Sequence, residues 1–256
     1  MNNTFSVIIP THNRPEKILR AVKAVLNQTY GHWELIVIDD GSNPMPEAIY
    51  KIRDPRLRII RQSVRHHKLI ARNMGMKIAI NSWICSGDDD DYHIPTYLEE
   101  FNNAINENLN DKIVRGIFVY QCGADFYKTI DGKQTKLRTL PPMKFHKDRR
   151  FEHLDDGLGL YPHFPSGRIT MGMFIFHRDC LKTIGYFPHV WTAGDFALQA
   201  DIPGYGMLSP QPPRFPKARC QVMGNPFGDD YWLFYKLTRH FQVGTIDKVL
   251  YIKECR

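Results

Sequence analysis

The chain has few cysteines, and none of them forms a pattern that points to a bridge or a metal. Its 256 residues include five cysteines, and no two of them have CxxC spacing. The odd number and the wide scatter count against both a disulfide framework and a zinc ribbon. A reducing compartment is the simplest interpretation, and we expect a cytoplasmic protein.

The N-terminal residues also lack the marks of a targeting segment. The opening stretch MNNTFSVIIPTHNRP has neither a basic segment nor a long apolar one, which argues against a secretory signal. No apolar run in the chain approaches the roughly 20 residues that a membrane-spanning helix needs. We therefore expect no transmembrane segment, while contact with a membrane surface stays open.

What is present is an ordinary globular composition with unevenly placed charge. Hydrophobic residues make up 43% and charged residues 24%, which excludes wholesale disorder. The net charge is +7, and residues 51–72 alone hold eight basic residues and one acid. Four consecutive carboxylates, Asp88–Asp91, follow closely. This order favours a site for a polyphosphate with a divalent metal, and a solvated basic face beside an acidic loop is the alternative.

Short apolar runs alternate with helical patterns through the first half of the chain, up to about residue 105. This alternation predicts βαβ units and an α/β fold, with a mostly parallel central sheet flanked by helices. Strands are expected at 5–9, 33–38, 57–60 and 83–85, and helices at 69–80, at 95–105 and after Asn13, with Asn13 as a cap and Pro15 in the first turn.

The second half of the sequence is less regular. Strands are expected at 117–120 and 171–176, a short helix at 179–184, and a helix followed by a strand within 228–253. The role of residues 110–165 stays unassigned. Within them, the basic stretch 136–150 is interpreted as a solvated loop, and a surface for an anionic acceptor is the alternative.

Three polar features carry candidate chemistry. Asp40 follows a predicted strand, where its carboxylate can accept a hydrogen bond from the ring N–H of uracil, thymine or guanine; turn formation by Asp40-Gly41 is the alternative. Asp88–Asp91 offer the oxygen ligands that Mg²⁺ or Mn²⁺ prefers, and their mutual repulsion calls for a cation. Arg72 is the basic residue best placed to reach a diphosphate.

Taken in order, these motifs resemble the inverting family 2 glycosyltransferases with the GT-A fold. The resemblance rests on Val-Ile-Ile-Pro-Thr-His-Asn-Arg-Pro, Ile-Asp-Asp-Gly-Ser, Ala-Arg-Asn, the aspartate cluster followed by Pro95, and a late Gly-Asp-Asp. It implies a single domain over residues 1–256, with a nucleotide-sugar half (1–105) and an acceptor half (106–256). It also implies transfer of a sugar from a nucleotide-sugar, with a UDP-sugar as first choice, to the hydroxyl of a glycan, a lipid-linked sugar or another acceptor.

The resemblance further assigns roles to individual residues. Pro10, Thr11 and Arg14 would line the base pocket, Asp40 would hold the base, and Arg72 would lie near the nucleotide. The DXD motif maps onto Asp88-Asp89-Asp90. Asp90 would be the main ligand of Mn²⁺ or Mg²⁺ with Asp88 as a second, and Asp88 or Asp89 would lie near the ribose and the metal-bound waters. Asp230 would be the general base.

Two departures from the family pattern bear on these assignments. His12 stands where the family usually has tyrosine. The family often places its base shortly after a Gly-Gly-Phe element, which here reads Gly185-Tyr-Phe and is followed by Gly194-Asp195, so Asp195 is a rival base. We prefer Asp230 because the residues after it fit the expected helix and strand better.

Other functions stay open at this stage. A sugar-nucleotide nucleotidyltransferase would want a glycine-rich phosphate loop after the first strand, where this chain has Pro-Thr-His-Asn-Arg. A nucleic-acid-binding module would use the basic segments, but the aspartate cluster would repel phosphates, so nucleic acid is expected only as an acceptor. A non-catalytic sugar-nucleotide binder is disfavoured because every motif position carries a competent side chain.

Overall fold

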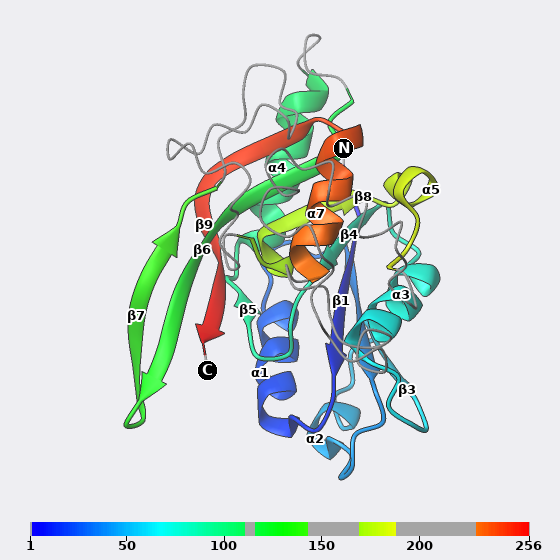
Figure 1. The fold of residues 1–256 in the computed structure, drawn as a ribbon, viewed down its shortest axis with the longest axis vertical. Coiled ribbons are helices and arrows are strands. Elements are labelled where there is room, and N and C mark those ends of the chain that lie inside the picture. Colours follow the sequence, from blue (N-terminus) through cyan, green and yellow to red (C-terminus); the bar gives the residue numbers. More distant parts are fainter. Residues whose placement is uncertain (1, 111–115, 143–168, 188–228, 256) are drawn as a thin grey trace, which may run out of the picture.

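A computed structural model describes residues 2–110, 116–142, 169–187 and 229–255. Within these ranges the strands form one mixed sheet in the order β3-β2-β1-β4-β8-β6-β9-β5, and β7 pairs with the outer part of β6 (Figure 1). The strands are β1 (Phe5–Thr11), β2 (Trp33–Asp39), β3 (Leu57–Arg61), β4 (Trp83–Ser86), β5 (Tyr92–His93), β6 (Val119–Ile130), β7 (Lys133–Leu140), β8 (Phe174–His177) and β9 (Val243–Cys255). The helices are α1 (Pro15–Leu26), α2 (Glu47–Tyr50), α3 (Lys68–Ile78), α4 (Tyr97–Asn110), η2 (Met171–Met173), α5 (Cys180–Ile184) and α7 (Asp229–His240).

The first four strands form the parallel half of the sheet. β1 pairs in parallel with β2 and with β4, and β2 pairs in parallel with β3. Every residue of β1 and β2 is buried, because helices cover both faces of these strands. The four strands expected in this half are confirmed, and their carboxyl ends bring the predicted polar motifs to one edge.

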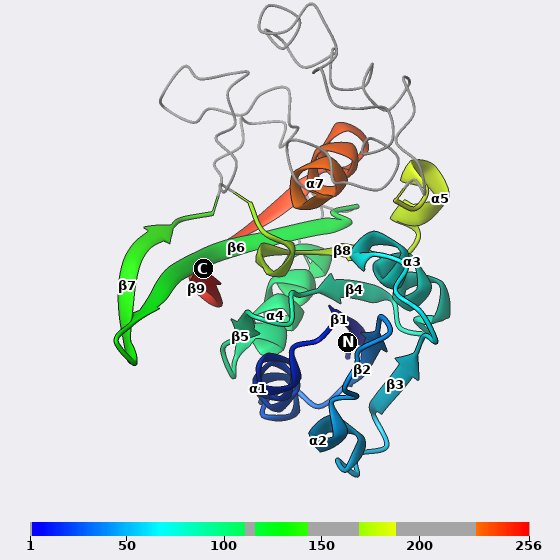
Figure 2. The same ribbon diagram turned by 60° about the horizontal axis from the view of Figure 1, so that its bottom comes forward.

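Helices pack on both faces of the sheet, so the strands sit between two apolar layers. Along β1, Phe5, Val7 and Ile9 pack with α1 and α4, whereas Ile8 packs with α3 on the opposite face. This alternation is the two-residue period of a strand. Figure 2 shows α1 and α3 on opposite sides of the parallel strands.

The second half of the sheet mixes directions. β8 runs antiparallel to β4 and β6, whereas the last strand, β9, runs parallel to β6 and antiparallel to β5. The expected strand at 171–176 is in part η2, and only its end belongs to β8. The helix and the strand expected within 228–253 are present as α7 and β9.

Two local expectations differ from the structure. Asn13 does not cap α1: its backbone has φ 55°, and the N-cap is Arg14, which makes no side-chain cap hydrogen bond. Asn13 instead accepts a hydrogen bond from the N–H of Asn43 at 2.7 Å, tying the first two loops together. The basic stretch 136–150, interpreted as a solvated loop, is in part a strand: residues 136–140 belong to β7 of the β6–β7 hairpin, and residues 143–150 lie outside the described residues. The turn of this hairpin, Asp131-Gly132, has positive φ at both residues, as tight hairpin turns require.

Candidate active site

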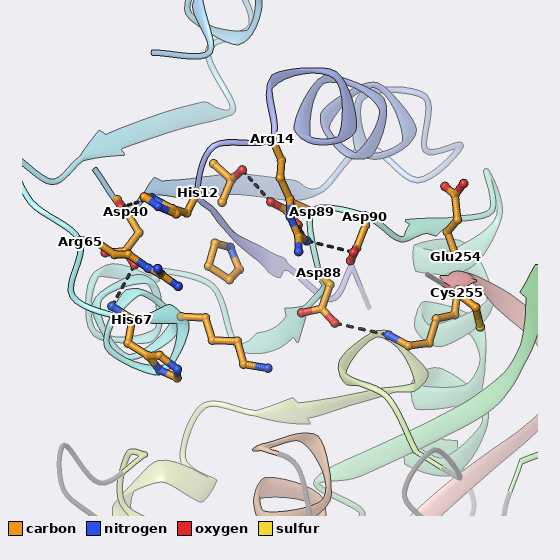
Figure 3. A pocket seen from close by; sticks show the side chains of 14 residues that line it. His12, Arg14, Asp40, Arg65, His67, Asp88, Asp89, Asp90, Glu254 and Cys255 are labelled. Carbon is orange, nitrogen blue, oxygen red and sulfur yellow. Dashed lines mark hydrogen bonds and ion pairs between the residues drawn. The ribbon is translucent and has the colours of Figure 1, made fainter. Parts of the chain in front are cut away.

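The loops that follow β1, β2 and β4 meet at one edge of the sheet and surround a cavity. The N–H of Asp40 donates to the carbonyl of Thr11 at 2.9 Å, which holds the first two loops together. The cavity has a volume of about 690 Å³, within the range of small-molecule sites in proteins. Its walls come from these loops, from the start of α3 and from the end of β9 (Figure 3).

Asp40 is held rigidly at one end of this cavity. Its two carboxylate oxygens accept the backbone N–H groups of His66 at 2.7 Å and His67 at 2.9 Å. The His12 ring nitrogen Nδ1 lies 2.8 Å from the carbonyl of Asp40, and Gly41 supplies the positive φ of the turn. The side chain is therefore fixed and almost fully buried, yet it lines the cavity.

The neighbouring Asp39 has a different task. It is fully buried, accepts the N–H of Ser42 at 3.0 Å and contacts the Tyr50 hydroxyl at 3.3 Å. Burial and the charge of Asp39 raise the pKa of Tyr50 to about 12, so this phenol stays protonated. Asp39 thus shapes the turn, and Asp40 alone of the pair lines the cavity.

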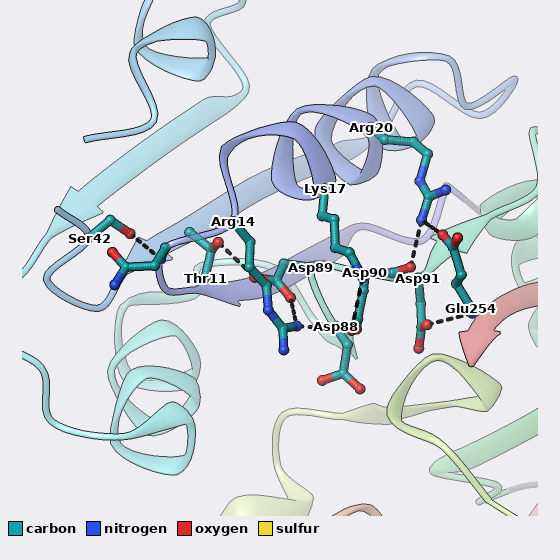
Figure 4. A network of polar contacts seen from close by, with 12 residues as sticks. Thr11, Arg14, Lys17, Arg20, Ser42, Asp88, Asp89, Asp90, Asp91 and Glu254 are labelled. Carbon is teal, nitrogen blue, oxygen red and sulfur yellow. Dashed lines mark hydrogen bonds and ion pairs between the residues drawn. The ribbon is translucent and has the colours of Figure 1, made fainter. Parts of the chain in front are cut away.

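Asp89 and Asp90 are tied to the first loop and to α1 (Figure 4). Asp89 accepts from the Thr11 hydroxyl at 2.8 Å and from Arg14 Nη1 at 2.7 Å. The same Arg14 nitrogen lies 2.9 Å from Asp90 Oδ2, and Lys17 Nζ lies 3.8 Å from that oxygen. Burial raises the pKa of Asp89 although Thr11 and Arg14 oppose the shift.

Asp88 faces three positive charges. Arg72 Nη2 forms an ion pair with Asp88 Oδ1, and Lys253 Nζ lies 3.5 Å from Asp88 Oδ2. Burial disfavours the ionised form, but Arg72, Lys253 and Lys68 outweigh it and hold the pKa of Asp88 well below its usual range. Arg72 also donates to the Ser86 hydroxyl at 3.2 Å and is 1% exposed. Asp88 is therefore an anion at neutral pH.

Asp91 fastens the last strand to the acidic loop. Its Oδ2 accepts from the Tyr251 hydroxyl at 3.0 Å and from Lys253 Nζ at 2.9 Å, and its Oδ1 accepts from the N–H of Glu254 at 3.0 Å. Arg20 bonds both the carbonyl of Asp90 and the Glu254 carboxylate, which strengthens the same junction. Both oxygens of Asp91 are thus engaged with β9.

The acidic loop has the donor set for a divalent metal. Asp88, Asp90 and Asp91 each offer one carboxylate oxygen, and these atoms lie within 4.8 Å of one another. Hard oxygen ligands of this kind suit Mg²⁺ or Mn²⁺. Asp91 contacts β9 through both oxygens, and the assignment of Asp90 and Asp88 as the metal ligands stays a prediction. The repulsion that led us to expect a metal is, however, already balanced by protein cations: Arg14, Lys17, Arg72 and Lys253.

The basic segment 51–72 does not form one patch. Arg56 pairs with Asp54, Arg58 pairs with Glu34, and Arg61 donates to the carbonyl of Ser42. Within this fully described segment, the basic side chains that line the cavity are Arg65 and Lys68. Most of the positive charge of segment 51–72 is therefore engaged in local ion pairs and hydrogen bonds.

The structure brings most of the predicted site residues to one place. The cavity is lined by Pro10, Thr11, Arg14, Asp40, Asp88, Asp89 and Asp90. Arg72 lies behind Asp88 instead of on the cavity wall, and its contact with a nucleotide stays a prediction. Asp230 lies in the first turn of α7, and its side chain is outside what the structure describes; Asp195 is outside the described residues.

Sequence reasoning did not single out several residues that line the same cavity as site residues. They are His12, Arg65, His67, Lys68, Lys253, Glu254 and Cys255. His12 belongs to the first motif, and the other three, Arg65, His67 and Lys68, lie in the basic segment 51–72, which the sequence connects with a polyphosphate without naming these residues as site residues. The last three come from the far end of the chain, and no local pattern marks them.

Comparison with known proteins identifies the family. Residues 6–176 match the family model described as Glycosyl transferase family 2. The chain belongs to glycosyl transferase family 2. As a member of this family it has a GT-A-like scaffold, and the acidic loop described above is consistent with a DXD motif.

Individual relatives of this family member match over part of their length. The glycosyltransferase GlyG of Streptococcus pneumoniae is 27% identical over 52% of this chain and 46% of GlyG. An Escherichia coli protein, UDP-Glc:alpha-D-GlcNAc-diphosphoundecaprenol beta-1,3-glucosyltransferase WfaP, is 32% identical over 48% of this chain and 49% of WfaP. The poly(ribitol-phosphate) beta-N-acetylglucosaminyltransferase TarP of Staphylococcus aureus is 33% identical over 43% of this chain and 35% of TarP. The chain thus spans less than half of these relatives.

Among solved structures, residues 1–349 of TarS from S. aureus share the fold of this chain. The TM-score is 0.58 at 16% identity, and the match covers 98% of this chain and 60% of the TarS fragment. The fold is therefore GT-A-like, as expected. None of the helices in the described ranges is both long enough and apolar enough to span a bilayer.

Proposed function

We propose that this glycosyltransferase moves a sugar from a UDP-sugar to an acceptor hydroxyl with inversion at the anomeric carbon. The observation that carries the proposal is the cavity itself, where a rigid carboxylate suited to a base and a DXD-like acidic loop line one wall. Ligands of open α/β sheets bind at this edge.

Uracil is the base that we favour for the donor. Asp40 offers carboxylate oxygens to a ring N–H, which uracil presents and cytosine lacks at the matching position. The printed names of relatives support this choice, since WfaP is described as acting on UDP-Glc. TarS has also been crystallised with UDP and with UDP-GlcNAc. A glucose-type or N-acetylglucosamine-type donor is the natural first test.

The reaction needs one base and no covalent intermediate. In the proposed mechanism Asp230, at the start of α7, takes the proton from the acceptor hydroxyl as its oxygen attacks the anomeric carbon. The bond from that carbon to the diphosphate oxygen breaks on the opposite face, and the electron pair leaves with UDP. Asp40 and the first loop hold the nucleotide, so the anomeric carbon meets the acceptor in one orientation.

A divalent metal belongs to this proposal as a cofactor. Mn²⁺ or Mg²⁺ held by Asp90 and Asp88 would offset the charge that develops on the departing diphosphate. Arg14 keeps Asp89 and Asp90 in place, and Arg72 keeps Asp88 ionised. These two arginines would therefore hold the carboxylates in position and keep Asp88 ionised for metal binding.

The two halves of the chain would divide the substrates. Residues 1–105 hold the donor, and residues 106–256 build the acceptor side and carry the base. The acceptor classes that we propose are a glycan hydroxyl, a lipid-linked sugar or another hydroxyl compound, in line with the diphosphoundecaprenol-linked acceptor in the name of WfaP. Cytoplasmic action, with contact at a membrane surface for a lipid-linked acceptor, fits this proposal.

A thermal-shift series tests the donor assignment. The purified protein is heated with UDP, GDP, CDP or dTDP, each with and without Mn²⁺. A ligand at 100 times its Kd adds about 2.7 kcal/mol of apparent stability, so UDP with Mn²⁺ should raise the melting temperature clearly. Release of UDP from UDP-Glc and UDP-GlcNAc is then measured with candidate acceptors.

A pair of variants shows whether the shift reports this cavity. Asp40→Asn should remove most of the UDP shift because it weakens recognition of the base. Asp125→Asn, a carboxylate paired with Lys136 outside the cavity, should keep it. Stabilisation by another nucleotide but not by UDP would overturn the donor assignment. No stabilisation by any nucleotide under either condition would overturn the proposed function.

A further inference from the structure

Lys253 stands out because it reaches the acidic loop from the opposite end of the chain. It lies on β9, and its ammonium Nζ is 2.9 Å from Asp91 Oδ2, 3.5 Å from Asp88 Oδ2 and 3.3 Å from the Thr170 hydroxyl. Its side chain is 26% exposed and lines the cavity. A positive charge is therefore built into the place where a family member is expected to hold a metal.

An anionic ligand in this cavity meets a wall of carboxylates, so it needs cations that it can touch. Arg72 neutralises Asp88, but it is only 1% exposed and does not line the cavity. Lys253 both pairs with that loop and faces the cavity. Lys68, the first residue of α3, lines the same cavity and adds its charge near Asp88.

The contacts of Lys253 leave it able to serve two partners. An ammonium group has three N–H donors. The shorter contacts, to Asp91 and Thr170, anchor the side chain, whereas the contact to Asp88 at 3.5 Å is long for a hydrogen bond. A donor directed at Asp88 can turn to a phosphate oxygen while the anchor to Asp91 is kept.

We infer that Lys253 binds the diphosphate of the nucleotide directly, so that UDP keeps measurable affinity when no divalent metal is present. The inference rests on the proposed function and deepens it. The lysine and the metal share the counter-charge at the diphosphate, and neither supplies all of it. Binding should therefore depend less steeply on metal than it would in a site made of carboxylates alone.

Isothermal titration calorimetry with UDP and with uridine, each in EDTA and in Mn²⁺, tests the inference. Lys253→Gln removes the charge but can still donate to Asp91, and Lys253→Arg keeps the charge. Lys248→Gln is the matched control, since Lys248 is on the same strand and pairs with Glu100 outside the cavity. In EDTA, K253Q should weaken UDP binding roughly tenfold to a hundredfold, the range of a charged hydrogen bond.

The other arms have equally definite expected results. Uridine affinity should be the same in the wild type and in K253Q, because uridine has no phosphate. K253R should retain most of the UDP affinity, and K248Q should match the wild type. In Mn²⁺ the loss caused by K253Q should be smaller than in EDTA.

Several results would overturn the inference and leave the proposed function standing. One is UDP binding by the wild type in Mn²⁺ only, and another is equal UDP affinity of wild type and K253Q in EDTA. A parallel loss of uridine affinity in K253Q and K253R would mean that the lysine only holds the acidic loop. If K253Q fails to fold, the wild type decides alone, because UDP must bind more tightly than uridine in EDTA. Absence of UDP binding in both EDTA and Mn²⁺ would instead overturn the proposed function.

Discussion

The two halves of the sheet reach the same acidic loop by different routes. In the parallel half, the functional side chains stand on loops directly after β1, β2 and β4, so their place follows from where a strand ends. In the other half, β9 contributes side chains from within the strand itself. Tyr251, Lys253 and Cys255 are two residues apart, so they share one face of the strand, and all three approach the loop or the cavity.

This difference separates two kinds of site residue. Loop residues after strands, such as Asp40, are positioned by backbone contacts to their neighbours and can be exchanged without altering the sheet. Residues on β9, such as Tyr251, are part of the core and of the site together, since Tyr251 is fully buried while its hydroxyl bonds Asp91. Substitutions in the second group should therefore change stability and binding together.

The sharpest division between the halves should appear at Asp230. If the first half binds the donor and α7 supplies the base, Asp230→Asn should lower turnover by about 10²–10⁴. UDP affinity should stay within about twofold, because the donor contacts lie elsewhere. Steady-state UDP release and calorimetry on the same preparation measure the two quantities.

The rival base provides the comparison for that experiment. Asp195→Asn should keep turnover close to that of the wild type if Asp230 is the base. Normal turnover in Asp230→Asn together with an inactive Asp195→Asn would transfer the role to Asp195.

The coupling between core and site in the second half can be broken at Gly172. A Cβ at this position would lie 1.8 Å from Cε2 and 2.2 Å from Cζ of the Tyr251 ring, so Gly172→Ala must displace the tyrosine that holds Asp91. Overpacking of this kind lowers the free energy of unfolding by about 1–3 kcal/mol. Urea denaturation measures the loss, and UDP affinity should fall with it.

Gly31→Ala is the matched control for Gly172→Ala. Nothing lies within 4 Å of a Cβ at Gly31, which lies between α1 and β2 in the parallel half. Its unfolding free energy should change by no more than about 0.5 kcal/mol. Equal stability of the two alanine variants would show that Tyr251 is not packed against η2 as described.

Much of the parallel half could be predicted from the sequence. Continuous apolar runs ended by polar motifs gave β1, β2 and β4 and the position of Asp40, since a strand buried on both faces leaves little choice of register. The arrangement of the loops then follows from parallel pairing.

The second half could not be predicted to the same degree. The β6–β7 hairpin was not predicted because β7 is exposed along nearly its whole length, so its sequence shows no alternation of apolar and polar residues. Lys253 and Cys255 were not predicted as site residues because the acidic loop, Asp88–Asp91, lies more than 150 residues earlier in the chain. For Arg72 the sequence predicted a contact with the nucleotide, whereas the structure shows an ion pair with Asp88. The direction in which a helical arginine points depends on the rotation of its helix, which the sequence does not fix.

His93 lies where the halves meet, and it should make the junction sensitive to acid. Its ring packs on Tyr97 and Tyr251, and burial lowers its pKa to about 3, against about 6.5 in an unfolded chain. The unfolded chain therefore binds a proton that the folded protein does not, and stability is lost as the pH falls from about 6.5 towards 3. The slope approaches about 1.4 kcal/mol per pH unit.

Urea denaturation at pH 7, 6 and 5 measures this slope. His93→Phe keeps an aromatic ring between the tyrosines but cannot titrate, so its stability should depend less on pH than that of the wild type. Because all other groups titrate in both proteins, the difference between the two slopes isolates His93. Parallel slopes would contradict a buried neutral histidine at this junction.

The smallest effect expected is a change in the reactivity of Cys255, and it tests whether β9 really borders the donor. Cys255 is partly exposed and lines the cavity, whereas Cys85, Cys122 and Cys180 are buried. Iodoacetamide should therefore modify Cys255 faster than these three thiols, as followed by mass spectrometry of the separate peptides. UDP should protect Cys255 in proportion to occupancy, slowing the reaction about tenfold at ten times its Kd. Uridine should protect it less, because the base end of the cavity at Asp40 is formed by the parallel half and the thiol stands beside Lys253. Equal protection by UDP and uridine would mean that Cys255 lies away from the diphosphate. The end of β9, which also carries Lys253, would then not border the diphosphate either.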